Sequence, residues 1–294
     1  MTFSLSLPRQ ICYPLARLAQ RSAPARPAKD DDQAEYYDHQ YRTTDHMRSR
    51  FFANLSVTGK VVLDVGSGLG GRAPYWMNQG AARVICIDVN RQELQAGQSI
   101  LANKFPQFAG KIEYHHPDDL TEPNFADVAV MVDVFEHLVN PRQVLLQCHR
   151  WLRPGGQLWS GSIGWYNYMA SHCLGHIPIP WCQVIFSQRA IIQTIRRIIH
   201  QPDYSPNVWE RLEGLGRWDK VQTLKDRPGE PLNMLSLRQV RKIFRQSPFE
   251  LTAFEIFGFS GRTNALARSV SSLAKIPMLR EFFHSYYTAM LTKR

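Results

Sequence analysis

Apolar and polar residues alternate along the middle of the chain in two different rhythms. Short apolar, β-branched runs predict five strands, at residues 60–65, 83–88, 111–115, 126–132 and 157–161. Between them, apolar residues at helical spacing predict helices at residues 70–79, 91–104 and 141–152. The run at 126–132 (ADVAVMV) is apolar throughout, which is typical of a strand buried on both faces. Strands that alternate with helices predict an α/β fold with a parallel sheet and right-handed crossovers.

Outside this middle part the pattern changes. The strand–helix rhythm stops at residue 163 and resumes only near residue 236, so we predict a helical insertion after the fifth strand. Beyond it we predict a helix at 236–246, strands at 250–258 and 262–267, and a basic helix at 275–294. Residues 30–55 predict an N-terminal helix, and residues 1–29 predict a flexible tail because SAPARPAK contains few bulky apolar residues.

Charge is distributed unevenly. The formal net charge is +10, and the segments 1–29 and 137–202 contain no Asp or Glu but five and six basic residues, respectively. Such a balance is compatible with nucleic acid, an anionic membrane surface or acidic small molecules, and it does not choose among them. Nucleic acid is disfavoured because the basic segments are rich in Ile and Trp rather than Lys, and no added RNA-binding module is recognisable.

The cysteines, the apolar runs and the N-terminal composition indicate the cellular compartment. The five cysteines form no C-x-x-C pair, which indicates a reducing compartment rather than a disulfide framework or zinc ribbon. No apolar run reaches the length of about 18 residues that a membrane span needs. The acid-free N-terminus has the composition of a transit peptide. We expect a cytoplasmic protein, with contact with the inner membrane surface and organelle import left open.

A glycine-rich stretch follows the first strand. VVLDVGSGLGG (residues 61–71) fits both G-x-G-x-x-G and D-x-G-x-G-x-G, so it matches two cofactor loops. Asp88, at the end of the second strand, suits ribose hydroxyls in either interpretation. Asp64 separates the two interpretations, because a carboxylate there would repel the phosphates of a dinucleotide and favour a cationic ligand.

The order of several motifs resembles the class I S-adenosylmethionine-dependent methyltransferases. The matching stretches are LDVGSGLGG (63–71), VICIDVN (84–90), DDL (118–120), ADVAVMVDVFEHL (126–138) and LRPGG (152–156). The resemblance implies a Rossmann-like, seven-stranded sheet with one antiparallel strand, here with a helical insertion after strand five and extra helices at both termini. It also implies that S-adenosylmethionine binds over the carboxyl ends of the strands.

The same resemblance assigns the cofactor residues. The methionine end would be lined by Asp64, Gly66, Ser67 and Gly68. Asp88 and Val89 would meet the ribose, Asp118 or Asp119 the adenine amino group, and Asp133 the methyl donor.

The stretch Asp133-Val-Phe-Glu136-His137 carries the candidate chemistry. If the strand runs into a helical turn, its two carboxylates and imidazole converge and suit a divalent metal. The pattern resembles the E-x-x-E-H of ubiquinone-pathway and small-RNA 2′-O-methyltransferases, where these residues hold a metal; here Asp replaces the first Glu. Metal-free relatives also carry E-H, so we assign no metal ligands and keep a divalent metal as an alternative.

Histidines after the fifth strand add a second source of acid–base chemistry. His172 and His176 lie in SHCLGHIPIPW, where the acceptor pocket is expected, and either could deprotonate a hydroxyl or serve a packing role. We select His172, His137 and Glu136 as the catalytic candidates.

Two segments raise the question of a membrane. Five isoleucines between 191 and 199 form a helical stripe, and the C-terminal PMLREFFHSYYTAMLTKR is basic and aromatic. The stripe is compatible with an interfacial helix on an anionic membrane or with a helix packed on the sheet. Peripheral membrane contact is therefore an expectation beside a small-molecule acceptor.

The sequence thus divides into five segments. These are a basic flexible tail (1–29), a helical lid (30–59), an S-adenosylmethionine-binding core (60–162), an acceptor-side helical insertion (163–235), and the end of the sheet with a basic helix (236–294). We expect a methyltransferase that acts on a hydroxyl of a small molecule, glycan or lipid-linked intermediate. An RNA 2′-O-methyltransferase and a non-catalytic cofactor-binding scaffold are the alternatives, and a dehydrogenase is the least favoured.

Overall fold

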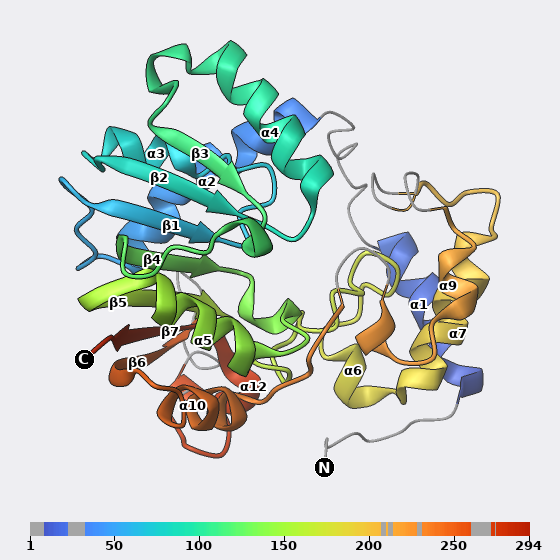
Figure 1. The fold of residues 1–294 in the computed structure, drawn as a ribbon. Coiled ribbons are helices and arrows are strands. Elements are labelled where there is room, and N and C mark those ends of the chain that lie inside the picture. Colours follow the sequence, from blue (N-terminus) through green and yellow to red (C-terminus); the bar gives the residue numbers. More distant parts are fainter. Residues whose placement is uncertain are drawn as a thin grey trace.

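A seven-stranded mixed sheet forms the centre of the computed structural model (Figure 1). The structure describes residues 9–22, 33–206, 210, 214–227, 231–259, 272–273 and 275–294. The strands are β1 (Val61–Val65), β2 (Arg83–Ile87), β3 (Ile112–His115), β4 (Ala126–Val132), β5 (Leu152–Ser162), β6 (Glu250–Gly258) and β7 (His284–Thr292). Their order is β3-β2-β1-β4-β5-β7-β6, with β1 to β5 parallel and β7 antiparallel to both neighbours. The predicted fold class is confirmed.

Helices cover both faces of the sheet. They are α2 (Gln33–Phe51), α3 (Ala73–Asn78), α4 (Arg91–Lys104), α5 (Pro141–Trp151) and α10 (Leu237–Arg245), with short turns η1 (Pro106–Phe108), η2 (Pro117–Asp119) and η3 (Phe135–His137). Alternate residues of β4 face opposite cores: Val130 packs in the cluster with Trp76 of α3, and Met131 in the cluster with Phe244 of α10. This double burial explains why the β4 run is apolar throughout.

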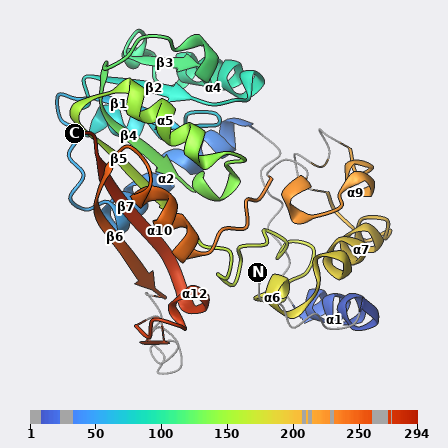
Figure 2. The same ribbon diagram turned by 60° about the horizontal axis from the view of Figure 1, so that its bottom comes forward.

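The insertion after β5 forms a third core, beside the sheet rather than on it. It contains α6 (Cys182–Ile185), α7 (Gln188–Ile199), α9 (Arg217–Lys220) and η4 (Leu224–Asp226). Figures 1 and 2 show α7 and α9 side by side with α1 (Arg9–Ser22) on the same side of the molecule. The isoleucine stripe of α7 is buried in this core, with Ile191, Ile195 and Ile198 fully buried. The interfacial interpretation of α7 is therefore wrong, and its packing partners are α1 and the insertion rather than the sheet.

The N-terminal segment is partly helical. The prediction of a flexible tail is wrong for residues 9–22, which form α1, while residues 1–8 and 23–29 lie outside the described residues. Cys12 and Ala16 of α1 are fully buried against the insertion. This tertiary contact, which local composition does not reveal, stabilises the helix.

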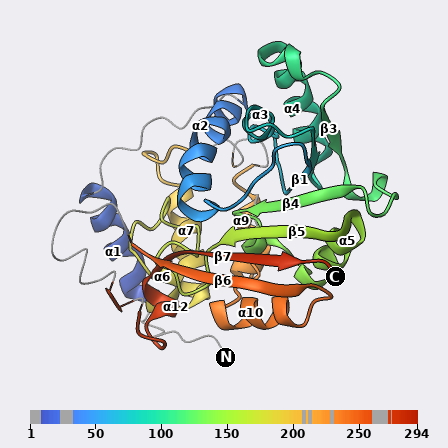
Figure 3. The ribbon, with the colours of Figure 1, turned by 90° about the vertical axis from the view of Figure 1, so that its left-hand side faces the viewer.

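The C-terminal segment is a strand and not the predicted basic helix. After the short α12 (Arg280–Phe283), β7 inserts between β5 and β6, as Figure 3 shows. Its residues are apolar and aromatic because the strand is covered on both sides, and such a run is ambiguous between helix and strand. The basic charge lies at its end, where Lys293 Nζ donates to the carbonyls of His149 and Leu152 at 2.7 and 2.8 Å. The short strand predicted at 262–267 lies outside the described residues.

His284, the first residue of β7, is fully buried in a neutral form. Its Nδ1–H donates to the carbonyl of Arg280 at 3.0 Å, and its Nε2 accepts from the backbone N–H of Gly164 at 2.9 Å. Burial lowers the pKa of His284 to about 4, from an ordinary value of 6.5. The residue thus fastens the start of β7 to the start of the insertion in its uncharged state.

This burial predicts an acid-sensitive contribution to stability. As pH falls from 6.5 towards 4, the unfolded chain binds a proton at His284 that the folded chain does not, so folding loses about 3 kcal/mol over this window. His284→Asn, which cannot take up that proton, should give a flatter dependence of unfolding free energy on pH. Denaturant unfolding of both proteins across the window measures the difference, and parallel curves would contradict the prediction.

No helix in the described part of the chain combines the length and apolarity that a membrane span requires.

Candidate active site

The glycine loop turns sharply at the carboxyl end of β1. Gly66 and Gly68 have φ values of +70° and +56°, in the left-handed region that favours glycine. A Cβ atom on Gly66 would lie 2.5 Å from a methyl group of Val134, so a side chain does not fit there. The backbone N–H of Gly68 donates to the carboxylate of Asp88 at 2.8 Å. The loop is thus pinned to the end of β2 and leaves close backbone access for a ligand.

Asp64 is paired with an arginine that the sequence analysis did not select. Asp64 is fully buried, and its carboxylate lies 3.2 Å from Nε of Arg72, whose Nη2 donates to the carbonyl of Gly66 at 3.0 Å. Burial raises the pKa of the Asp64 carboxyl, and the charge of Arg72 opposes this rise. The carboxylate of Asp64 therefore balances the charge of Arg72 next to the loop. Attraction of a cationic ligand by Asp64 stays a prediction. The signal that could have found Arg72 is its place directly after the loop.

Asp88 is the carboxylate best placed for ribose. It is half-buried, and besides Gly68 it accepts from the backbone N–H of Asn90 at 2.9 Å. The next residue, Val89, is 76% exposed and forms an open apolar surface at this rim. Ser67 is buried within the loop. These positions agree with the assigned ribose and loop roles, which stay predictions.

Removing the Asp88 carboxylate should weaken cofactor binding. Asp88→Ala removes the carboxylate that accepts from the loop and that we expect to bind ribose, so we expect the Kd for S-adenosylhomocysteine to rise roughly a hundredfold. Isothermal calorimetry measures this. Asp127→Ala is the matched control, because Asp127 bonds Val61 and Arg153 at the opposite end of the strands. Equal affinities of all three proteins would contradict the ribose assignment.

The two acidic residues that the resemblance assigns to the adenine amino group differ in accessibility. Arg91 engages the carboxylate of Asp119 with two hydrogen bonds, of 2.8 and 3.1 Å. The side chain of Asp118 is 79% exposed, and its backbone N–H donates to His116 Nδ1. Both residues lie on η2, so Asp118 presents the more accessible carboxylate for an amino group.

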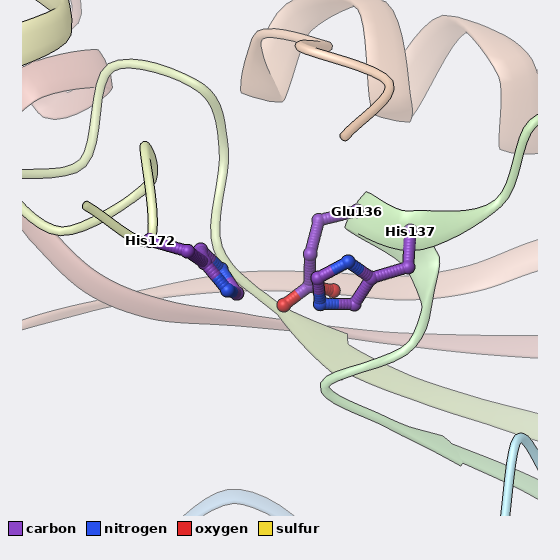
Figure 4. A group of neighbouring side chains, drawn as sticks. All are labelled: Glu136, His137 and His172. Carbon is purple, nitrogen blue, oxygen red and sulfur yellow. The ribbon is translucent and has the colours of Figure 1, made fainter. Parts of the chain in front are cut away.

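Glu136, His137 and His172 come together beyond the ends of β4 and β5 (Figure 4). Each offers one ligand atom, and these atoms all lie within 4.8 Å of one another. The two imidazole rings meet edge to face, with centroids 4.8 Å apart at 85°. Glu136 and His137 come from η3, and His172 comes from the insertion, where it has a φ of +52°. The structure thus assembles all three catalytic candidates.

Hydrogen bonds orient two members of this cluster. Ser162 Oγ donates to the carboxylate of Glu136. The Nδ1 of His137 lies 3.0 Å from the carbonyl of Pro231, and a carbonyl requires a donor, so this contact assigns the proton to Nδ1. Nε2 of His137 then carries the lone pair. Ser162 is a further site residue that the sequence analysis missed.

Asp133 does not join the cluster, contrary to the predicted convergence with Glu136 and His137. The chain turns at Asp133, whose φ is +54°, and η3 begins only at Phe135, so helical spacing does not apply across this stretch. Asp133 is exposed and interacts with the hydroxyl of Tyr286. Burial first, and then the charges of Asp133 and Glu136, raise the pKa of Tyr286. The role at the methyl donor that the resemblance assigns to Asp133 stays a prediction.

His176 is part of the insertion core and not of the cluster. It is 2% exposed, its Nε2 lies 2.7 Å from the carboxylate of Glu210, and its ring stacks on Tyr204. This placement confirms the packing role and contradicts the role of proton acceptor.

The donors of the cluster fit a divalent cation. One carboxylate and two imidazoles are ligand types that bind transition metals and leave coordination positions open. The bond from His137 Nδ1 to a carbonyl fixes the tautomer that exposes Nε2, which is common for metal-binding histidines.

A cavity of about 570 Å³ adjoins the cluster. It has His137 in its wall, and its lining mixes apolar side chains (Val139, Leu232, Leu235 and Ile243) with the amides of Asn140 and Asn233. Arg142, Lys225 and Asp226 add charges of both signs to the lining. The cavity has the size of a small-molecule pocket.

Comparisons with known proteins agree with this geometry. A family model described as "Methyltransferase domain" matches residues 63–160. The ubiquinone biosynthesis O-methyltransferase of Pseudomonas entomophila is 27% identical over 177 residues, which cover 58% of this chain and 67% of that protein. The histone-arginine methyltransferase CARMER of Aedes aegypti is 29% identical over 123 residues, which cover 40% of this chain and only 20% of that protein.

One solved structure shares the fold across most of the chain. It is a chain of the complex between the Haloferax volcanii Trm112 methyltransferase activator and its methyltransferase, with 12% identity and a TM-score of 0.51. The match covers 90% of this chain and 95% of that one.

Proposed function

Since the chain belongs to the class I S-adenosylmethionine-dependent methyltransferases, we propose that it methylates a hydroxyl oxygen of a small-molecule, glycan or lipid-linked acceptor. The observation that carries the proposal is the assembly of Glu136, His137 and His172 beside the cofactor edge of the sheet. Such a group can remove the proton from a hydroxyl acceptor. Amine and thiolate acceptors depend less on this proton removal. The similarity to ubiquinone biosynthesis O-methyltransferases supports an oxygen acceptor.

The loop residues hold and orient the cofactor. S-Adenosylmethionine, when bound, supplies an activated methyl group on a sulfonium, so transfer is an in-line displacement. Asp88 would bind the ribose hydroxyls, and the left-handed glycines let backbone N–H groups approach the methionine end. The Asp64–Arg72 pair keeps this loop in shape.

The cluster prepares the acceptor. Nε2 of His137 carries a lone pair and would accept the proton of the acceptor hydroxyl as its oxygen attacks the methyl group. The carboxylate of Glu136, held by Ser162, would stabilise the imidazolium that forms. His172 would close the site from the insertion, and the cavity beside His137 would receive the body of the acceptor.

A divalent cation is a second way in which the same residues could act. Glu136, His137 and His172 would hold it, and the cation would lower the pKa of a bound hydroxyl. In that case the imidazole nitrogens serve as ligands and not as proton acceptors.

The test is methyl transfer from labelled S-adenosylmethionine to a panel of phenols, hydroxylated lipids and glycans, with an RNA oligonucleotide and an arginine peptide as competing classes. We expect transfer to a hydroxyl compound, abolished by His137→Ala, with S-adenosylhomocysteine binding retained. Chelation by EDTA separates metal ligation from proton acceptance. Transfer to RNA or peptide alone, or binding without any transfer, would contradict the proposal.

A further inference from the structure

Residues 231–235 connect the insertion with the sheet and contact the turn η3 on the way. Leu232 is buried within the insertion core, and Leu235 packs against the core of the sheet. Figures 1 and 2 show this part of the chain, in orange, running from the insertion towards α10. The 231–235 segment therefore joins both parts of the molecule at the place where Glu136 and His137 lie.

Asn233 donates hydrogen bonds to three backbone carbonyls in and directly after η3. Its backbone N–H donates to the carbonyl of Glu136 at 2.8 Å. Its side-chain Nδ2 donates to the carbonyl of Phe135 at 2.6 Å and to that of Leu138 at 3.3 Å. The two side-chain bonds thus bracket Glu136 and His137, the two members of the cluster that η3 supplies.

The turn η3 has few bonds of its own. It is a 3₁₀ turn of three residues, held internally by bonds from the N–H of His137 to the carbonyl of Val134 at 2.9 Å and from the N–H of Leu138 to the carbonyl of Phe135 at 3.4 Å. Hydrogen bonds in 3₁₀ geometry are poorer than those of an α-helix. The directions of the Glu136 and His137 side chains therefore depend on contacts from outside the turn.

The 231–235 segment is itself held in place. The Oδ1 of Asn233 accepts from the backbone N–H of Leu235 at 3.2 Å, and the carbonyl of Leu235 accepts from the N–H of Trp165 at 2.8 Å. With two bonds from Nδ2 and one to Oδ1, the amide of Asn233 has a single favourable orientation. The segment thus offers η3 a fixed support.

The same segment forms part of the cavity beside His137. Pro231, Leu232, Asn233 and Leu235 all line it. The residues that support η3 are therefore also the residues against which an acceptor in this cavity would lie.

We propose that Asn233 is a positioning residue of the methyl-transfer site, which holds η3 so that Glu136 and His137 face the acceptor. The inference rests on the proposed function, because Asn233 acts through the groups that prepare the acceptor. A misplacement of about 1 Å can lower a reaction rate roughly a hundredfold. By fixing η3, Asn233 also keeps the Nδ1 of His137 at the carbonyl of Pro231, which maintains the tautomer with the lone pair on Nε2.

Asn233→Ala tests the proposal in the full chain. The variant keeps the backbone bond to Glu136 and loses the side-chain bonds to Phe135 and Leu138. We expect kcat with the acceptor found in the panel to fall roughly tenfold to a hundredfold. The KM for the acceptor and the Kd for S-adenosylhomocysteine should stay within about twofold of wild type, because the cavity and the glycine loop are kept.

Ser236→Ala is the matched control in the same part of the chain. Ser236 caps α10, and its Oγ accepts from the backbone N–H of Gln239 at 3.2 Å. Loss of this cap should lower the stability of the protein and leave kcat unchanged. The control thus separates a loss of stability near the site from a loss of orientation within it.

A spectroscopic measurement separates this proposal from the proposed function. With ¹⁵N-labelled histidine and EDTA present, NMR at about pH 8 reports which ring nitrogen of neutral His137 carries the proton. The signal is assigned by its loss in His137→Gln. We expect the single Nδ1–H tautomer in wild type and in Ser236→Ala, and a mixture of both tautomers in Asn233→Ala. This result needs no acceptor, so it supports the positioning role even if no hydroxyl compound is methylated.

Three results would overturn the proposal. An Nε2–H tautomer in wild type would show that the ring is not held at Pro231. A single Nδ1–H tautomer in Asn233→Ala would show that Asn233 does not position it. Equal losses of kcat in Asn233→Ala and Ser236→Ala would show that lower stability alone accounts for the effect. Circular dichroism spectra like that of wild type establish that each variant is folded.

Discussion

Glu136→Gln is expected to lower kcat by roughly 10²- to 10⁴-fold while leaving the affinity for S-adenosylhomocysteine unchanged. The amide keeps the size of the side chain but removes the charge that faces His137 and His172. Without the negative charge of Glu136, the imidazolium formed when His137 accepts a proton is no longer stabilised. A metal ion would also lose its carboxylate ligand. Single-turnover rates with the acceptor found in the panel, together with calorimetry, separate chemistry from cofactor binding.

The control for this substitution is Glu113→Gln on β3. Glu113 is a half-buried carboxylate on β3, which β2 and β1 separate from β4, and it is paired with Arg83 at 3.1 Å and with His115 at 3.0 Å. Its replacement should leave kcat within about twofold of wild type, because the residue lies away from the cluster and a partly exposed ion pair contributes little to stability. If Glu136→Gln behaves like this control, the cluster does not prepare the acceptor.

Arg72→Met is expected to cost about 3–5 kcal/mol of unfolding free energy, because it leaves Asp64 buried without a counter-charge. The loss should depend on pH with a definite sign. Burial raises the pKa of Asp64, and without Arg72 nothing opposes that rise, so the folded variant binds a proton that the unfolded chain releases. Stability of the variant should therefore be highest in acid and fall as pH rises.

Two comparisons make this result specific. Arg83→Met breaks the more exposed pair with Glu113 and should cost at most about 1 kcal/mol. Adding Asp64→Asn to Arg72→Met removes the buried charge and should recover part of the stability and abolish the pH dependence. Equal losses for Arg72→Met and Arg83→Met in denaturant unfolding would show that the loop does not depend on the buried pair.

The sheet and its glycine loop were predictable because their signals are local. A strand buried on both faces is apolar throughout, as β4 is, and the cap residue Asn90 accepts from Gln92 and Glu93 at the start of α4. The order of such segments then determines the topology with few alternatives. The pairing of Glu136 with His137 was equally local, because the two residues are neighbours in η3.

Other features depend on contacts between distant residues. His172 joins the cluster only because the insertion folds back across the end of β5, and Asp133 leaves it because of one left-handed residue. Helix α1 is stable through its contacts with α7, and β7 is a strand because two other strands enclose it. The sequence periodicity within these two segments does not specify such partners. The local pattern therefore predicted a flexible tail in place of α1 and a helix in place of β7.

The position of β7 has a consequence for synthesis on the ribosome. Strands β1 to β5 can pair as they emerge, but the outer edge of β5 lacks its neighbour until residues 284–292 have left the exit tunnel. β6 is made earlier than β7 and has no strand to pair with until then. The nascent chain therefore exposes the open edge of β5 from the emergence of residue 162 until that of β7, a state prone to aggregation and suited to chaperone binding. Closure of the sheet couples folding to the appearance of β7.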